Sequence, residues 1–197
     1  MRIAITGGIG SGKTYIANYI KSKGYKVVDA DEVARQLMQK GNINHYLIVE
    51  YFGEEILGID GEIDRNILRK IVFADSEKRK MLNKITHPAI MRNILEVTTG
   101  DEMYFVEIPL LFEEDLENDF DQSWVADCSL EVQIDRVVKR SKLNKKEVMD
   151  IILTQISRQE RNARADVVID TEKPDLYNKI DSLIEGLEKQ ENNEKRI

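Results

Sequence analysis

The sequence is poor in cysteine and proline, and it has no long apolar run. Cys128 is the only cysteine among 197 residues, so neither a disulfide within the chain nor a paired-cysteine metal site can form. A single cysteine is typical of a small buried side chain in a reducing compartment. The first apolar run, residues 3–6, ends at glycines, and no run approaches membrane-spanning length. We therefore expect a cytoplasmic protein without a membrane partner.

The charge is acidic overall but unevenly distributed. The formal net charge of −7 argues against a general nucleic-acid partner. Residues 129–164 are an exception, because they carry nine lysines and arginines against five acidic residues. On its own this positive stretch is typical of a solvated helix face.

Five short apolar segments rich in β-branched residues predict strands. They are mostly apolar rather than alternating, which favours a parallel sheet covered on both faces. Helical patterns at 13–23 and 173–189 lie between or after them, so the fold class is α/β, doubly wound. The predicted strands are residues 2–6, 26–30, 103–108, 123–128 and 166–170.

Two long segments between the predicted strands contain no convincing strand. Residues 31–100 are far more than one crossover helix needs, so we predict a helical lobe there. Residues 129–164 predict a second helical insertion, which carries the positive stretch. With a core at about 1–30, 101–128 and 165–197, the chain is predicted to be one domain with two helical additions.

A glycine-rich segment, TGGIGSGKTY at residues 6–15, joins the first predicted strand to the first predicted helix. Gly7, Gly12, Lys13 and Thr14 fit the pattern G-x-x-x-x-G-K-[S/T] of a phosphate-binding loop. Glycines permit positive φ values and close backbone approach, so N–H groups and the helix N-terminus can meet phosphate oxygens. Lys13 offers a charge to the β- and γ-phosphates, and the Thr14 hydroxyl suits Mg²⁺. The segment therefore predicts nucleoside-triphosphate binding.

A regulatory GTPase is one class that such a loop could indicate. Residues 178–181, NKID, match the guanine-reading motif N-K-x-D of those proteins. Here, however, the tetrad lies inside a predicted amphipathic helix, and no aspartate precedes a glycine by three residues. We therefore interpret NKID as an ordinary helix segment and favour a small-molecule kinase.

Two carboxylates follow the second predicted strand, in VVDAD at residues 27–31. In extended geometry Asp29 and Asp31 point to the same side, at the carboxyl edge of the sheet where ligands bind in this architecture. One of them could orient or deprotonate an acceptor hydroxyl. The alternative for Asp31 is an N-cap of the following helix.

Glu107 ends the third predicted strand and could hold Mg²⁺ directly or through water. The alternative is a strand-end acid that faces solvent.

Several basic residues are candidates for phosphate contacts. Arg136 and Arg140 are four apart, on one face of a predicted helix, and a movable helical flap could bring both to the transferring phosphoryl group. Arg65 could act from the helical lobe, or lie on its surface. His87 precedes Pro88 and is expected outside helical geometry, with a structural role or a substrate contact.

At this point the sequence resembles the dephospho-CoA kinases. The glycine-rich loop alone is shared by many families, whereas ITHP, PLLFE and the AD-x-V-I ending together are more specific. The residues that carry the resemblance run from one end of the chain to the other: TGGIGSGKT (6–14), VVDAD (27–31), DR (64–65), ITHP (85–88), PLLFE (109–113), QIDRVVKR (133–140), Gln155 and ADVVID (165–170).

The resemblance implies ATP-dependent phosphorylation of the ribose 3′-hydroxyl of dephospho-CoA, the last step of coenzyme A synthesis. It implies a P-loop core, a CoA-facing lobe at about 31–100 and a lid at about 129–164. The expected cofactors are ATP and Mg²⁺, and the expected partner is the small molecule dephospho-CoA.

The resemblance also implies roles for individual residues. Asp31 takes the place of the base, and Lys13, Arg65 and Arg140 take the places of phosphate and transition-state contacts. Together with the residue patterns above, we expect Lys13, Arg140 and Mg²⁺ to hold the γ-phosphoryl group, and Thr14 and Glu107 to contact the metal. Substrate contacts are expected from Asp29, Asp31, Arg65 and His87. The expected ATP-binding residues are Gly8, Gly10, Ser11, Gly12, Lys13, Thr14 and Tyr15.

Three positions depart from the family's pattern. Tyr15 stands where members have a small hydroxyl residue, and we expect its phenol to pack on an adjacent helix. Ile151 replaces an arginine, and Thr171 replaces the asparagine after V-I-D, which puts in doubt how the lid and the adenine side hold the nucleotide. A P-loop kinase for a nucleoside, nucleotide or sugar acid is the runner-up function, followed by a nucleotide-dependent switch.

Overall fold

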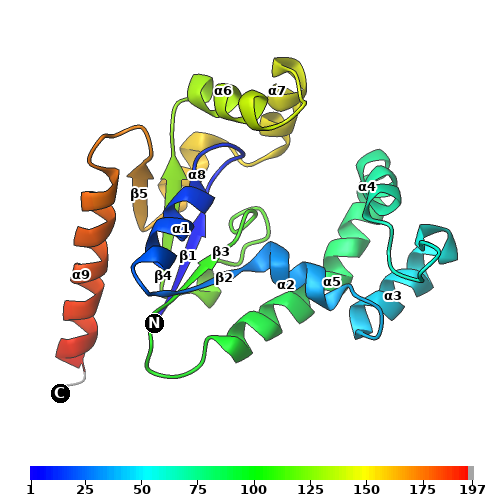
Figure 1. Cartoon of the computed structure of the whole chain (residues 1–197), viewed down its shortest axis with the longest axis horizontal. Coiled ribbons are helices and arrows are strands. Elements are labelled where there is room, and N and C mark those ends of the chain that lie inside the picture. The colour runs from blue at the N-terminus through cyan, green and yellow to red at the C-terminus, as the bar shows by residue number, and fades with distance from the viewer. Residues whose placement is uncertain (195–197) are drawn as a thin grey trace. The chain divides into compact units, whose positions relative to one another are not determined.

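The computed structural model describes residues 1–194, which form two compact units (Figure 1). Unit 1 contains Met1–Val28 and the chain from Asp101 onward, and unit 2 contains Asp29–Gly100. Each unit has its own hydrophobic core. No helix within residues 1–194 is both long enough and apolar enough to cross a membrane.

Unit 1 is built on a five-stranded sheet with the strand order β2-β3-β1-β4-β5. The pairings of β1 with β3, of β1 with β4 and of β4 with β5 are parallel. All five predicted strands are confirmed, with ends that differ by at most one residue. The strands are β1 Arg2–Thr6, β2 Lys26–Asp29, β3 Tyr104–Glu107, β4 Gln122–Asp127 and β5 Val167–Asp170.

The register of the sheet brings the carboxyl ends of its central strands together. Ile5 of β1 lies opposite Glu107 of β3 and Trp124 of β4. In parallel α/β sheets ligands bind beyond this edge. The loop that follows β1 therefore begins at the edge where a binding site is expected.

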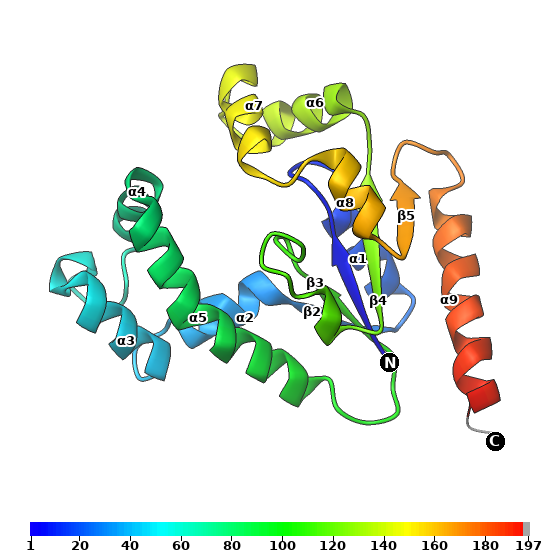
Figure 2. The same ribbon diagram turned by 180° about the vertical axis from the view of Figure 1, so that it is seen from behind.

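Helices cover both faces of this sheet. Helix α1 (Lys13–Ser22) buries Ile16, Ala17 and Ile20, and α9 (Leu176–Glu194) buries an apolar stripe that includes Ile180. Helix α8 (Arg158–Arg164) contacts β4. In Figure 1 α1 lies in front of the sheet, and in Figure 2, the view from behind, α8 lies in front of it.

The last helix tests two predictions. It begins at Leu176, three residues later than predicted, and extends beyond residue 189. Pro174 precedes the helix and belongs to a turn. Residues 178–181 lie inside α9 and Ile180 is fully buried, which confirms that NKID is an ordinary helix segment.

The positive stretch forms three helices of unit 1: α6 (Leu130–Arg140), α7 (Lys145–Thr154) and α8. Helices α6 and α7 contact each other and bury Val137 and Val148. Asn144 and Glu147 form a capping box that fixes the start of α7. A short 3₁₀ helix, η2 (Glu117–Asp119), precedes β4.

Unit 2 is helical, with one isolated β-bridge between Leu57 and Ile63. Its core includes Ile48, Phe52 and Leu68. The elements are α2 (Ala30–Leu37), α3 (Ile43–Phe52), the 3₁₀ helix η1 (Glu54–Ile56), α4 (Arg65–Ala74) and α5 (Ser76–Val97). The side chains of Asp64 and Asp75 cap α4 and α5.

Two local predictions in unit 2 are wrong. The extended geometry predicted for Asp29 and Asp31 ends at Asp29, because its Oδ1 accepts hydrogen bonds from the N–H groups of Asp31 (2.9 Å) and Glu32 (3.3 Å) and starts α2. The N-cap is therefore Asp29 and not Asp31. His87 and Pro88 lie inside α5, not outside helical geometry. A proline removes one N–H donor from a helix, and the other hydrogen bonds of this 22-residue helix keep it continuous.

The single thiol gives a first test of this packing. Cys128 is 2% exposed, and burial raises the pKa of its thiol. A raised pKa leaves less thiolate at neutral pH, so Ellman's reagent should react with the folded chain at least roughly tenfold more slowly than with the chain in denaturant. The rate should rise with pH. Rapid labelling of one thiol per folded chain would contradict the buried position.

Candidate active site

The glycine-rich loop occupies residues 7–12, between the end of β1 and the start of α1. Gly10 (φ +75°) and Gly12 (φ +101°) adopt left-handed conformations that other residues avoid. The loop also packs tightly on the protein itself. A Cβ on Gly10 would lie 2.7 Å from Gln133 O, so this glycine is required by the neighbouring helix as well as by any ligand.

Several N–H groups of this loop have no protein partner. Within residues 1–194, no hydrogen bond joins the N–H of Gly10, Gly12, Lys13 or Thr14 to another protein atom. The first turn of a helix leaves such donors unpaired, and its positive end attracts anions. A set of backbone N–H donors at the N-terminus of α1 is therefore available to phosphate oxygens.

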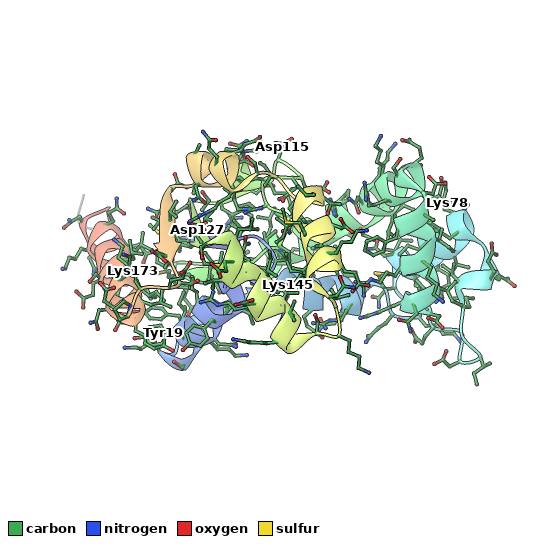
Figure 3. All side chains as sticks on the ribbon, turned by 90° about the horizontal axis from the view of Figure 1, so that it is seen from above. Tyr19, Lys78, Asp115, Asp127, Lys145 and Lys173 are labelled. Atoms are coloured by element: carbon green, nitrogen blue, oxygen red, sulfur yellow. The ribbon has the colours of Figure 1, made fainter. Side chains whose placement is uncertain are left out.

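A cavity of about 480 Å³ opens at these donors, entirely within unit 1. The loop forms one side, and α6 and the segment before α9, where Figure 3 labels Lys173, form others. Ser11 does not line it, because its side chain is 1% exposed beneath the loop. The lining residues are Gly8, Gly10, Gly12, Lys13, Thr14, Tyr15, Arg136, Arg140, Thr171, Lys173, Pro174, Leu176 and Tyr177.

The two residues predicted to hold a metal are in contact. Thr14 Oγ1 donates to Glu107 Oε1 at 2.5 Å. Glu107 is 8% exposed, so the alternative of a strand-end acid facing solvent is wrong. No cluster of three or more His, Cys, Asp or Glu residues that could hold a metal occurs within residues 1–194. Two oxygen donors fit Mg²⁺, because this ion is commonly completed by substrate phosphates and water.

The two arginines of α6 differ in their surroundings. Arg140 is exposed and lines the cavity. Arg136 is bonded to the protein, because Nη1 donates to Thr171 Oγ1 (2.8 Å) and Ser11 O (3.2 Å), and Nη2 donates to Thr171 O (3.0 Å). Both arginines therefore line the cavity, but the guanidinium of Arg136 is already bonded to protein groups, and the role predicted for the pair at the phosphoryl group stays a prediction.

Two further arginines, which the sequence analysis did not single out, are bonded or packed near the loop. Arg158 makes a two-bond pair with Asp127 at the end of β4 (2.8 and 2.6 Å), which raises the pKa of the arginine. Figure 3 labels Asp127. Arg161 is 6% exposed, and burial lowers its pKa. A Cβ on Gly8 would lie 3.1 Å from Arg161 Nη1. The only sequence signal for Arg158 and Arg161 was their spacing in RQER, residues 158–161.

Tyrosine side chains form another wall of the cavity. The rings of Tyr15 and Tyr177 are stacked with centroids 5.7 Å apart, and their hydroxyls are hydrogen-bonded. The predicted packing of Tyr15 on an adjacent helix is therefore confirmed, with α9 as that helix. Tyr15 remains 55% exposed.

The remaining predicted site residues belong to unit 2. Asp31 is the second residue of α2, and its side chain is exposed. Arg65 is the first residue of α4 and is exposed, whereas His87 is half-buried in α5. Asp29 caps α2 and lies 3.9 Å from Arg35.

Comparison with known sequences identifies the family. A family model described as dephospho-CoA kinase matches residues 1–175. The dephospho-CoA kinase of Fusobacterium nucleatum subsp. nucleatum is 37% identical over 191 residues, which cover 95% of this chain and 98% of the relative. The dephospho-CoA kinase of Shewanella oneidensis is 43% identical over 171 residues, which cover 85% and 83%.

Comparison with solved structures agrees with the sequences. The crystal structure of TT1252 from Thermus thermophilus matches with a TM-score of 0.82 and 30% identity, over 96% of this chain and 97% of that one. The predicted P-loop type of parallel sheet flanked by helices is therefore confirmed. On the extent of the family match and of these likenesses, the chain belongs to the dephospho-CoA kinase family.

Proposed function

We propose that this chain transfers the γ-phosphoryl group of ATP to the ribose 3′-hydroxyl of dephospho-CoA, giving CoA and ADP. This reaction is the final step of coenzyme A synthesis. The observation that carries the proposal is a phosphate-binding loop with unpartnered N–H donors in a chain of this family. Unit 2 is assigned as the substrate lobe and residues 129–164 as the lid.

The nucleotide site is assigned to the cavity beside the loop. The N–H groups of Gly10, Gly12, Lys13 and Thr14 donate to phosphate oxygens, and the N-terminus of α1 adds a favourable field. Lys13 is half-buried and places its ammonium among the β- and γ-phosphates. Arg140, exposed in the same cavity, supplies a second cation.

A magnesium ion is assigned to Thr14 and Glu107. The Thr14 hydroxyl would bind the ion, and the Glu107 carboxylate would bind it directly or through water. The bound ion would neutralise negative charge on the β- and γ-phosphates. Glu107 also holds the Thr14 hydroxyl in place through their hydrogen bond.

The acceptor is assigned to unit 2, with contacts from Asp29, Asp31, Arg65 and His87. Asp29 Oδ1 caps α2, so we assign the accepting carboxylate to Asp31. The 3′-oxygen attacks the γ-phosphorus, the bond from that phosphorus to the β–γ bridging oxygen breaks, and the 3′-hydroxyl proton passes to Asp31. Lys13 and Arg140 stabilise the charge on the transferring group, since positioning and electrostatics are most of what this chemistry needs.

A panel of acceptors tests the reaction. In a coupled assay for ADP, dephospho-CoA should give a kcat/KM at least about a hundredfold above that of shikimate, gluconate or a nucleoside monophosphate, because only one acceptor can fill a site built for it. A preference for another acceptor would indicate the runner-up kinase. Tight GTP binding with slow hydrolysis and no acceptor use would indicate a switch.

Replacing the proposed base tests Asp31. Asp31→Asn keeps the size of the side chain but loses the negative charge, so kcat should fall about a hundred- to a thousandfold while the Kd for ATP stays within twofold. Glu32→Gln, the next residue of the same helical turn, is the matched control and should keep kcat. Full activity of Asp31→Asn would remove this residue from the mechanism.

Replacing Glu107 tests the magnesium site. Glu107→Gln can still accept the Thr14 hydroxyl but is a weaker metal ligand, so the Mg²⁺ concentration for half-maximal activity should rise about tenfold or more. Glu102→Gln changes an exposed acid two residues before the same strand and serves as the control. An unchanged Mg²⁺ titration for Glu107→Gln would exclude Glu107 as a metal contact.

A further inference from the structure

The carbonyl oxygens of the phosphate-binding loop are held by side chains from elsewhere in unit 1. Ile9 O accepts from Gln133 Nε2 at 3.1 Å. Ser11 O accepts from Thr171 Oγ1 at 2.6 Å and from Arg136 Nη1 at 3.2 Å. On the other side of Ile9, its N–H donates to Gln155 Oε1 at 2.9 Å.

These bonds determine which way the unpartnered donors face. In a trans peptide the C=O and the following N–H point in opposite directions. A bond to Ile9 O therefore directs the Gly10 N–H away from Gln133, and bonds to Ser11 O direct the Gly12 N–H away from Thr171 and Arg136. Gly10 and Gly12 are among the loop positions whose N–H groups have no protein partner within residues 1–194.

The glycines of the loop require side chains outside it to fix the orientation of their neighbouring peptide groups. Because glycine populates both signs of φ, a peptide beside it can rotate and present its C=O to the phosphates, where it repels them. Within the loop, the Ser11 N–H donates to Gly8 O at 3.1 Å, a bond that leaves the peptides before Gly10 and Gly12 unconstrained. The constraint has to come from side chains that are themselves fixed.

The two glutamines meet that requirement. Gln133 is 7% exposed on α6, three residues before Arg136 and thus on the same face of the helix. Gln155 is the C-cap that follows α7, and the N–H of the next residue, Ile156, donates to Glu113 Oε1 at 3.1 Å. One residue of the loop, Ile9, is therefore held through both its N–H and its C=O by residues of the inserted helices.

We propose that Gln133 and Gln155 are positioning residues that orient the peptide groups on both sides of Ile9 and so preset the donors for phosphate. They act through the loop backbone and contact no substrate. The proposal deepens the assigned ATP site and rests on the proposed function for the identity of the nucleotide only.

Binding of a bare polyphosphate tests the proposal without base, ribose or acceptor. Gln133→Met and Gln155→Met keep the length of the side chain but remove the bond, so calorimetry should show the Kd for tripolyphosphate and for ATP rising by the same factor, about five- to tenfold. The KM for dephospho-CoA should stay within twofold. Gln159→Met, an exposed glutamine of α8, is the matched control and should bind as the wild type does.

A charged substitution at the two positions separates the hydrogen bonds from a general loss of stability. Gln133 donates and Gln155 accepts, so Gln155→Glu keeps its bond to Ile9 N whereas Gln133→Glu loses its bond to Ile9 O. Each variant adds one negative charge beside the same residue. The Kd for tripolyphosphate should therefore rise several-fold more in Gln133→Glu than in Gln155→Glu.

The wild-type protein gives a measurement that does not depend on any variant. In hydrogen exchange followed by NMR, the Ile9 amide should be protected before ligand is added, whereas the Gly10 and Gly12 amides should become protected when tripolyphosphate binds. An Ile9 amide that exchanges as fast as Gly10, or methionine variants with lowered Tm but wild-type Kd, would overturn the proposal. Failure to phosphorylate dephospho-CoA would overturn the proposed function and leave these results standing.

Discussion

The candidate active site of unit 1 depends on a few backbone N–H groups that stay unpaired at the N-terminus of α1. A folded chain normally pairs such groups, so the loop must be prevented from satisfying its donors with its own carbonyls. Side chains accomplish this by occupying the carbonyls instead: Gln133 takes that of Ile9, and Thr171 with Arg136 takes that of Ser11. The strand order supports the arrangement, because β1 lies between β3 and β4 and the loop therefore has a rigid strand end on either side.

The arginines of residues 129–164 differ in what they contact. Arg158 is paired with Asp127, and Arg164 donates to Phe112 O at 3.0 Å and contacts Glu117. Arg136 is bonded to backbone oxygens and to Thr171. Arg158 and Arg164 of the positive stretch are thus paired with acidic side chains, and its residue with an exposed side chain in the cavity is Arg140.

The sequence was informative wherever the signal was local. All five strands and the loop follow from short apolar runs and from one spaced pattern, each contained in a few residues. The hydrogen bonds that shape the loop were not predictable, because Ser11 and Thr171 are 160 residues apart and Ile9 and Gln155 are 146 apart. The error at Asp29 was of another kind. Both aspartates could cap a helix, and which one does so depends on where the strand stops, a boundary that periodicity leaves uncertain by a residue or two.

Thr171 shows why a departure from a family pattern has to be judged by its contacts. Its replacement of an asparagine raised doubt about the grip on the nucleotide, yet its hydroxyl is engaged with the loop. Oγ1 donates to Ser11 O and accepts from Arg136 Nη1, a combination that one hydroxyl can satisfy because it is both donor and acceptor. The same side chain limits the space at Gly12, where an added Cβ would lie 3.2 Å from Thr171 Cγ2. The residue therefore serves the orientation of the loop as well as lining the cavity.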